Sequence, residues 1–258
     1  MKIRSAGAIA VLVLSTVAFS LVAGRTRAQN PTLHVMISDG MKTVIEELTP
    51  RIESSIGRKL DAQFNSSKNL RDKIQSGEQF DAAILTGDVL DDLIQKGKIT
   101  AGTRVELSRT GMGVGVRAGA AKPAIATPDA LKQTLLNAKS VAFNPTGASA
   151  SPTYAIFARL GITDAMKPKL MLEAEAGRPQ MNVAAGKTEL VISLIPEIQF
   201  FPGVDLVGPI PAELQSYVNF AGGLAQNARD TTAAKSLLQF LAGPEAAPVL
   251  KAKGMEPR

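Results

Sequence analysis

Residues 60–86 read LDAQFNSSKNLRDKIQSGEQFDAAILT, two short apolar runs with one amphipathic run between them. The runs Leu60 to Phe64 and Phe80 to Thr86 have the length of strands. Between them, Leu70 and Ile74 are spaced like one face of a helix that ends at Gly77. Strand, helix and strand in this order predict two parallel strands joined by a right-handed helical crossover.

The same alternation extends in both directions from this stretch. Upstream, residues 33–37 form an apolar run, and the apolar positions of residues 44–56 repeat every three or four residues. Downstream, the long glycine-containing segment 104–117 is followed by a second series of short apolar runs and helical faces. We therefore predict an α/β protein with parallel or mixed sheets in two lobes and a ligand cleft between them. Residues 31–110 and 203–258 are expected to form lobe 1, and residues 111–202 lobe 2.

The first 28 residues have the pattern of a secretory signal peptide. A basic start precedes an apolar run, and small residues follow at the predicted cleavage site after Ala28, with cleavage after Gly24 as the alternative. The length of the apolar run also leaves an uncleaved membrane anchor open. We expect a protein exported to the periplasm. Four positive charges lie in the leader: Lys2, Arg4, Arg25 and Arg27. The net charge of the rest of the chain is therefore near +2, which gives no reason to expect nucleic-acid binding.

Composition excludes several classes of site. The chain has no cysteine and a single histidine, so zinc, iron–sulfur and cysteine-nucleophile sites are not expected, and we predict neither a metal nor a cofactor. His34 lies within the apolar run of residues 33–37, where we interpret it as a strand residue packed against a neighbour. The run Gly111 to Val116 lacks the spacing of a nucleotide loop and is interpreted as a strand with small residues.

Serine-rich segments follow several predicted strands. They lie at residues 38–42, 66–69 and 147–152, each where a strand would lead into a helix. In open parallel sheets, ligands bind beyond the carboxyl ends of the strands, and free N–H groups at helix starts bind anions. Each serine on its own could instead serve only as a helix cap. Because several such segments would surround one cleft, we predict a shared anion site.

Three stretches resemble periplasmic solute-binding proteins of the molybdate-binding type. Asn65 to Leu70 with Ile74 to Asp81 is similar to the family's serine-rich loop and the helix that follows it. Asn182-Val183 before Gly186 to Leu190 resembles the segment that leads into a strand of the second lobe. Phe240 to Ala246, with the tail at residues 254–257, resembles the closing helices. The resemblance covers nearly the whole chain after the leader and implies the two-lobe type II periplasmic binding protein fold.

The resemblance also implies a set of site residues. The family binds its oxyanion with two serines, backbone amides and a tyrosine hydroxyl. Ser67 matches the second serine, and Gly40 stands at the first, close to Ser38. The backbone donors correspond to Ser149 and Val183, and the tyrosine position falls near Leu194-Ile195, where no hydroxyl exists. Ser66 completes the expected ligand-binding set, and three cations are expected near the cleft (Lys42, Lys68 and Arg178).

Cations in place of neutral donors favour a ligand with several carboxylates over a small dianion. The first functional prediction is a monomeric solute-binding protein that captures a small anion, an organic polycarboxylate or a molybdate-like oxyanion, for the membrane subunits of an ABC importer. Periplasmic aconitate isomerases resemble the same family, so an isomerase that interconverts cis- and trans-aconitate is the alternative. In that case Asp39 or Lys42 would be the base, and Lys68 and Arg178 would hold carboxylates.

Overall fold

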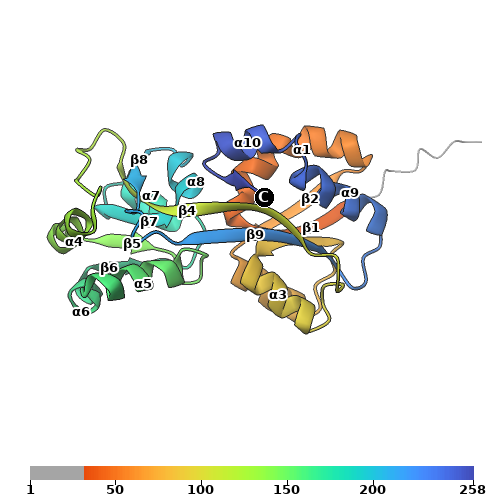
Figure 1. The fold of residues 1–258 in the computed structure, drawn as a ribbon, viewed down its shortest axis with the longest axis horizontal. Coiled ribbons are helices and arrows are strands. Elements are labelled where there is room, and N and C mark those ends of the chain that lie inside the picture. Colours follow the sequence, from red (N-terminus) through yellow and green to blue (C-terminus); the bar gives the residue numbers. More distant parts are fainter. Residues whose placement is uncertain (1–31) are drawn as a thin grey trace, which may run out of the picture.

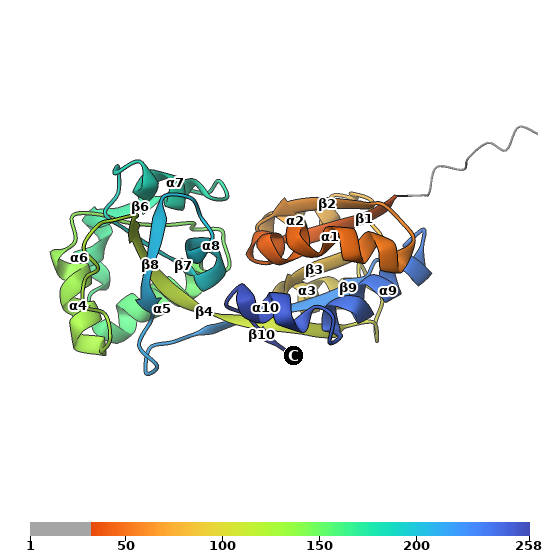
Figure 2. The same cartoon turned by 90° about the horizontal axis from the view of Figure 1, so that it is seen from above.

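The computed structural model describes residues 32–258, so the predicted signal peptide lies outside the described residues. Two α/β lobes lie side by side, and the long strand β4 runs through both (Figures 1 and 2). β4, Val105–Arg117, pairs with β9 through residues 105–111 and with β7 and β8 through residues 112–117. The predicted α/β class with a mixed sheet is confirmed.

The first lobe contains both the beginning and the end of the described chain. Its strand order is β2-β1-β3-β9-β4, in which β1 is parallel to β2 and β3, while β9 is antiparallel to β3. Its elements are β1 (Leu33–Ser38), η1 (Asp39–Met41), α1 (Lys42–Ile56), β2 (Leu60–Asn65), α2 (Ser67–Gln75), β3 (Ala82–Thr86), α3 (Gly87–Gln95), β9 (Tyr217–Leu224), α9 (Thr231–Ala242), α10 (Ala247–Ala252) and β10 (Glu256–Pro257).

The second lobe continues the sheet in the order β4-β7-β5-β6. β5 is parallel to β6 and β7, and β7 is antiparallel to β4. Its elements are α4 (Pro128–Asn137), β5 (Val141–Phe143), α5 (Ala150–Leu160), α6 (Thr163–Met166), η2 (Lys167–Lys169), β6 (Leu170–Leu172), α7 (Arg178–Ala184), β7 (Leu190–Leu194), α8 (Ile195–Gln199) and β8 (Val204–Pro209).

Helices pack on both faces of the first-lobe sheet because its central strands are apolar on both sides. The side chains of Val35 and Ile37 pack toward α1, whereas Met36 belongs to the cluster that includes Leu70 and Ile74 of α2. α1 buries the apolar face predicted from its spacing and ends at Gly57, whose φ of 65° suits glycine. Pro50 lies inside α1, although a proline is expected to kink or split a helix. It is tolerated because it lies on the exposed side, where its missing N–H leaves a carbonyl that water can reach.

One predicted boundary differs from the structure. Residues 203–258 are predicted to lie in lobe 1, whereas β8 pairs with Gly113–Arg117 of β4 in lobe 2. Val204 packs in a cluster with Val183, Val191 and Ile198, which explains why this strand stays with the second lobe. The chain therefore crosses between the lobes twice, once through β4 and once through residues 210–216. Within residues 32–258, no helix has the length and apolar character needed to cross a membrane.

Candidate functional site

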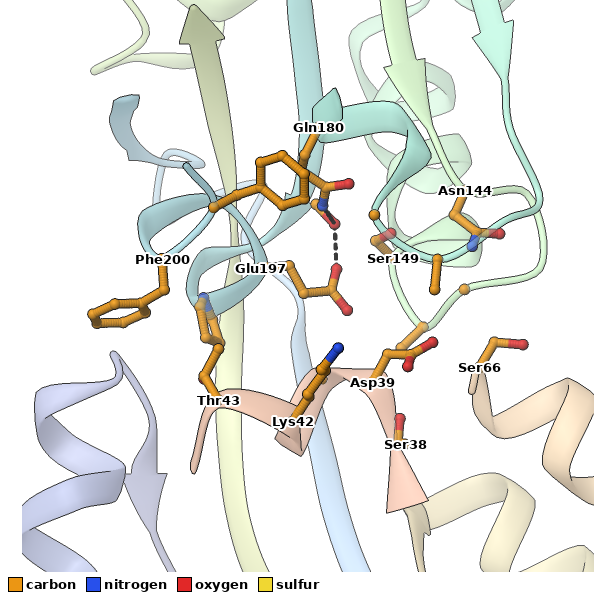
Figure 3. Close-up of a pocket in the computed structure, with 18 of the residues that line it drawn as sticks. Ser38, Asp39, Lys42, Thr43, Ser66, Asn144, Ser149, Gln180, Glu197 and Phe200 are labelled. Carbon is orange, nitrogen blue, oxygen red and sulfur yellow. Dashed lines mark hydrogen bonds between the residues drawn. The ribbon is translucent and has the colours of Figure 1, made fainter. Parts of the chain in front are cut away.

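A cavity of about 370 Å³ lies between the lobes (Figure 3). The first lobe contributes the end of β1, the first turn of α1 and Ser66, and the second lobe contributes the loop after β5, the starts of α7 and α8, and residues 200–202. Its polar lining comprises Ser38, Asp39, Lys42, Thr43, Glu46, Ser66, Asn144, Ser149, Gln180, Ser193 and Glu197. The site thus lies at the carboxyl ends of β1, β2, β5 and β7, as expected for an α/β sheet.

After the end of β1, the backbone at Gly40 lies close to Phe220 of β9 and Leu194 of β7. A Cβ atom at Gly40 would lie 2.5 Å from Cζ of Phe220 and 3.0 Å from Cδ1 of Leu194. Only glycine fits here, so the first serine of the molybdate pattern could not be accommodated without moving Phe220. Ser38 is buried beside it and also lines the cavity.

The two serines before α2 have different positions. Ser66 lines the cavity and caps α2, where its hydroxyl accepts a hydrogen bond from the N–H of Asn69 at 3.2 Å. Ser67 is buried, and its hydroxyl accepts a hydrogen bond from the N–H of Thr86 at 3.0 Å, which ties α2 to β3. The Ser67 hydroxyl retains its own proton as a donor.

Ser67 and Lys68 line a neighbouring cavity of about 640 Å³ instead of the first one. The two cavities meet at Gly147 and Ala148, which line both. Within the described chain, the neighbouring cavity also contains Arg71 and Arg104, which are paired with Asp72 and Asp91. Lys68 could therefore contact only a ligand that extends past the loop of residues 145–150.

Two predicted site residues lie away from both cavities. Arg178 begins α7, but its guanidinium pairs with Glu175 at the surface. Val183 is fully buried in the core cluster of the second lobe, within α7, so its N–H is part of the helix. Ser149, by contrast, is buried at the cavity wall, and its carbonyl accepts hydrogen bonds from the N–H and hydroxyl of Thr153.

Two carboxyl groups, Asp39 from the first lobe and Glu197 from the second, line the cavity. Burial raises the pKa of Asp39 to about 6, and the neighbouring Lys42 ammonium opposes this shift. On the opposite lobe, burial raises the pKa of Glu197 to about 7. Hydrogen bonds from the Ser193 hydroxyl and the Leu194 N–H oppose that shift, whereas the Asp39 charge adds to it. Both groups can therefore exchange a proton near neutral pH.

Lys42 is the only lysine or arginine that lines the first cavity in the described part of the chain. Its ammonium lies 3.8 Å from a carboxylate oxygen of Glu46 and 5.7 Å from the centre of the Phe64 ring. Figure 3 shows the Lys42 side chain extending into the cavity toward the Glu197 carboxyl. The ammonium can thus attract one anionic group of a ligand that lies between the two carboxyls.

The remaining wall is apolar and comes from the second lobe. Met181 and Phe200 line the cavity and are exposed, and three further apolar side chains extend the wall (Pro196, Phe201 and Pro202). An inorganic oxyanion has no group that benefits from such a wall, whereas a carbon chain does. Within residues 32–258, no group of three histidine, cysteine or acidic side chains is arranged to hold a metal ion.

Sequence reasoning missed Glu197, Ser193 and Gln180. The signal for Glu197 was present, because Ile195-Pro196-Glu197 directly follows Leu194, the last residue of β7, and the site lies at the carboxyl ends of the parallel strands. The family pattern has a tyrosine hydroxyl near this position, and this chain has no hydroxyl at Leu194 or Ile195. Glu197, two residues beyond Ile195, lines the cavity.

Comparison with known proteins identifies relatives of two kinds. A family model described as bacterial extracellular solute-binding protein matches residues 33–256. An aconitate isomerase of a Pseudomonas species is 31% identical over 232 residues, 88% of each chain. The molybdate-binding protein ModA of Azotobacter vinelandii is 25% identical over 235 residues, covering 88% of this chain and 90% of that protein.

Structural comparison agrees with the family match. The solved structure of the periplasmic molybdate-binding protein of Azotobacter vinelandii has a TM-score of 0.74 at 16% identity. It covers 86% of this chain and 98% of the solved one, which shows the shared type II fold of periplasmic binding proteins. The chain belongs to the bacterial extracellular solute-binding protein family.

Proposed function

We propose that this protein is an isomerase that binds an organic polycarboxylate of the aconitate class and moves a proton along its carbon chain. The observation that carries the proposal is the pair of cavity carboxyls, Asp39 and Glu197, whose pKa values are raised to about 6 and about 7. General acid–base catalysis is most effective when the pKa of the catalytic group lies near the working pH.

A protein that only binds an oxyanion does not need two carboxyls such as Asp39 and Glu197 in its cavity. An anion placed between two carboxyls is repelled whenever either one is ionised, and each buried carboxyl destabilises the empty protein. The neutral donors of the molybdate pattern are also incomplete, because Gly40 leaves no room for a side chain and Leu194-Ile195 provides no hydroxyl. The relative named aconitate isomerase supports the same interpretation.

The ligand chemistry follows from the lining. Lys42 and Ser66 can hold carboxylates from the first lobe, and the backbone around Ser149 can do so from the second. The apolar wall of Met181 and Phe200 would contact the carbon chain. A longer or more highly charged ligand would reach Lys68 and Ser67 in the neighbouring cavity.

The proton shift can be written as two transfers on a three-carbon allylic unit. Ionised Asp39 removes a proton from the CH2 carbon, and the electron pair of that C–H bond becomes the new double bond. The electron pair of the old double bond forms a C–H bond at the far carbon with the proton of neutral Glu197. Asp39 is then protonated and Glu197 ionised, and exchange with solvent restores the pair. Lys42 stabilises the negative charge that develops on the adjoining carboxylate.

The proposal is tested by incubating the protein with trans-aconitate in D2O and following the cis isomer by proton NMR. Conversion with deuterium at the newly protonated carbon is the expected result. Asp39→Asn and Glu197→Gln should each lower the rate by roughly 10²- to 10⁴-fold. Glu78→Gln, an exposed carboxyl outside the cavity, is the matched control and should leave the rate unchanged. A folded protein that converts neither isomer contradicts the proposal.

Capture for transport is the second candidate, and the two crossings between the lobes favour it. Lobes joined only by β4 and residues 210–216 can close over a solute by hinge bending. In this case the protein acts as a periplasmic monomer that delivers the anion to an ABC importer. A thermal-shift panel of molybdate, sulfate, citrate and both aconitates separates the candidates, because any ligand specific to the folded form raises the melting temperature. Tight binding of molybdate without a response to polycarboxylates would favour transport.

A further inference from the structure

Glu197 belongs to a short hydrogen-bonded chain in the second-lobe wall of the cavity. Gln180, on α7, donates from Nε2 to the hydroxyl oxygen of Ser193 at 3.4 Å. Ser193, near the end of β7, donates its hydroxyl to Oε2 of Glu197. Gln180 and Ser193 are each 4% exposed, so water has little access to either. In this arrangement Gln180 is the donor to Ser193, and Ser193 is the donor to Glu197.

A serine hydroxyl has one proton to donate. Because the Gln180 amide donates to the oxygen of Ser193, that proton is directed to Oε2 of Glu197. An oxygen that accepts this bond is a poor place for the carboxyl proton, so the proton of neutral Glu197 resides on Oε1. Figure 3 shows the second oxygen of Glu197 on the side of the cavity that holds Asp39 and Lys42.

We propose that Ser193 and Gln180 are positioning residues that keep the transferable proton of Glu197 on the oxygen facing the cavity. This inference rests on the proposed proton transfer and adds a role for two residues that need not touch the ligand. The charged side chains that line the same cavity are Asp39, Lys42 and Glu46, all from the first lobe. Lys253 of the C-terminal segment lies over the Phe200 ring next to α8. The Lys253 ammonium is itself paired with Glu47 at 2.8 Å, and among the charged groups only the Asp39 charge raises the pKa of Glu197.

A purely structural role for Glu197 makes different predictions. Glu197 lies in the first turn of α8 and accepts a hydrogen bond from the N–H of Leu194, the residue that caps this helix. If capping were its only role, removing the Ser193 hydroxyl would change stability but leave the pH dependence of the reaction unaltered. The titration of Glu197 and the pH profile therefore distinguish positioning from capping.

The experiment titrates the glutamate side-chain carboxyls by carbon-13 NMR in the full chain, with Glu197→Gln to assign the signal. Ser193→Ala removes the donated hydrogen bond and should move the Glu197 titration upward by about one pH unit. Ser193→Thr retains a hydroxyl and should stay near the wild-type value. Gln180→Met removes the upstream donor at similar volume and should produce a smaller upward shift. Ser140→Ala is the matched control, since its hydroxyl accepts from the Glu189 N–H far from the cleft.

The same variants are then assayed for isomerisation of trans-aconitate across pH. Ser193→Ala should move the alkaline limb upward with the titration and lower kcat several-fold, with little change in KM. An unmoved titration or an unmoved limb in Ser193→Ala overturns the positioning role even if the wild-type enzyme isomerises its substrate. A shifted titration in a protein that isomerises nothing supports the hydrogen-bonded chain and contradicts the proposed function, so the two failures are distinguishable.

Discussion

At the scale of single residues, Glu197 should reduce the stability of the folded protein as the pH rises. Its pKa is raised from 4.5 to about 7, so the folded state binds its proton more tightly than the unfolded state does. Stability from this group is thus greatest below about pH 4.5 and is lost as the pH rises through about 7. This direction is opposite to that of a carboxylate stabilised by an ion pair.

Glu197→Gln should therefore stabilise the protein at pH 8, by roughly 1–3 kcal/mol, and have little effect near pH 4.5. Urea unfolding at the two pH values measures the difference. Asp39→Asn should behave in the same direction with a smaller effect, because the pKa of Asp39 is raised less. The exposed Glu78→Gln serves as control. A Glu197→Gln protein that is less stable than wild type at pH 8 would show that the charge of Glu197 is stabilised and contradict the raised pKa.

The place of a residue in the site could be predicted from sequence where it directly follows a strand, because ligands bind beyond the carboxyl ends of strands. Ser38, Asp39 and Lys42 follow directly from the end of a recognisable strand, and the structure places all three at the cavity. The predicted position of Lys68 differs from the structure, because Lys68, the second residue of α2, lines the neighbouring cavity. Arg178 is adjacent in sequence to cavity residues but pairs with Glu175, a contact that no spacing rule indicates. The raised pKa of Glu197 depends on packing from two lobes and has no signature in sequence.

At the scale of elements, long periodic segments could be predicted and short ones could not. α1 has enough residues to show its helical period and ends at Gly57 as predicted, and the run Gly111 to Val116, predicted as a strand, lies within β4. The region of residues 163–172 holds α6, η2 and β6, of three or four residues each, and no periodic pattern can develop over such lengths. β8 lies in the range predicted to belong to the first lobe, and only its pairing with β4 places it in the second lobe.

Ser67 connects two elements, and its replacement should affect both folding and ligand binding. Ser67→Ala leaves the buried N–H of Thr86 without its acceptor, which should cost about 1–3 kcal/mol in the free energy of unfolding. Because α2 would then be held less firmly against β3, the adjoining Ser66 and the cavity should also bind the ligand less tightly. Urea unfolding and calorimetric titration with trans-aconitate measure the two effects. Ser76→Ala, an exposed serine at the end of the same helix, should change neither. Unchanged stability would show that Thr86 finds another acceptor.

At the scale of the whole molecule, the cleft depends on how the two crossings are held together. β4 changes partner from β9 to β7 between Gly111 and Met112, and the second crossing passes the same point. Gln215 joins the crossings: its Oε1 accepts from the N–H of Met112 at 2.7 Å, and its Nε2 donates to the Met112 carbonyl at 3.0 Å. A Cβ atom at Gly111 would lie 3.0 Å from this side chain, so glycine gives Gln215 the space it needs.

Gln215→Ala should therefore loosen the arrangement of the lobes while leaving each lobe folded. The variant loses both hydrogen bonds to Met112 and a third to the Ile210 carbonyl, which should lower the free energy of unfolding by about 1–3 kcal/mol. Small-angle X-ray scattering should give a larger radius of gyration without ligand, because the two crossings are no longer tied. The dissociation constant for trans-aconitate should rise severalfold, since closing a more mobile cleft costs more conformational entropy. Gln226→Ala, an exposed glutamine in the loop after β9, is the matched control. A Gln215→Ala protein with wild-type scattering and affinity would mean that β4 alone sets the geometry of the cleft.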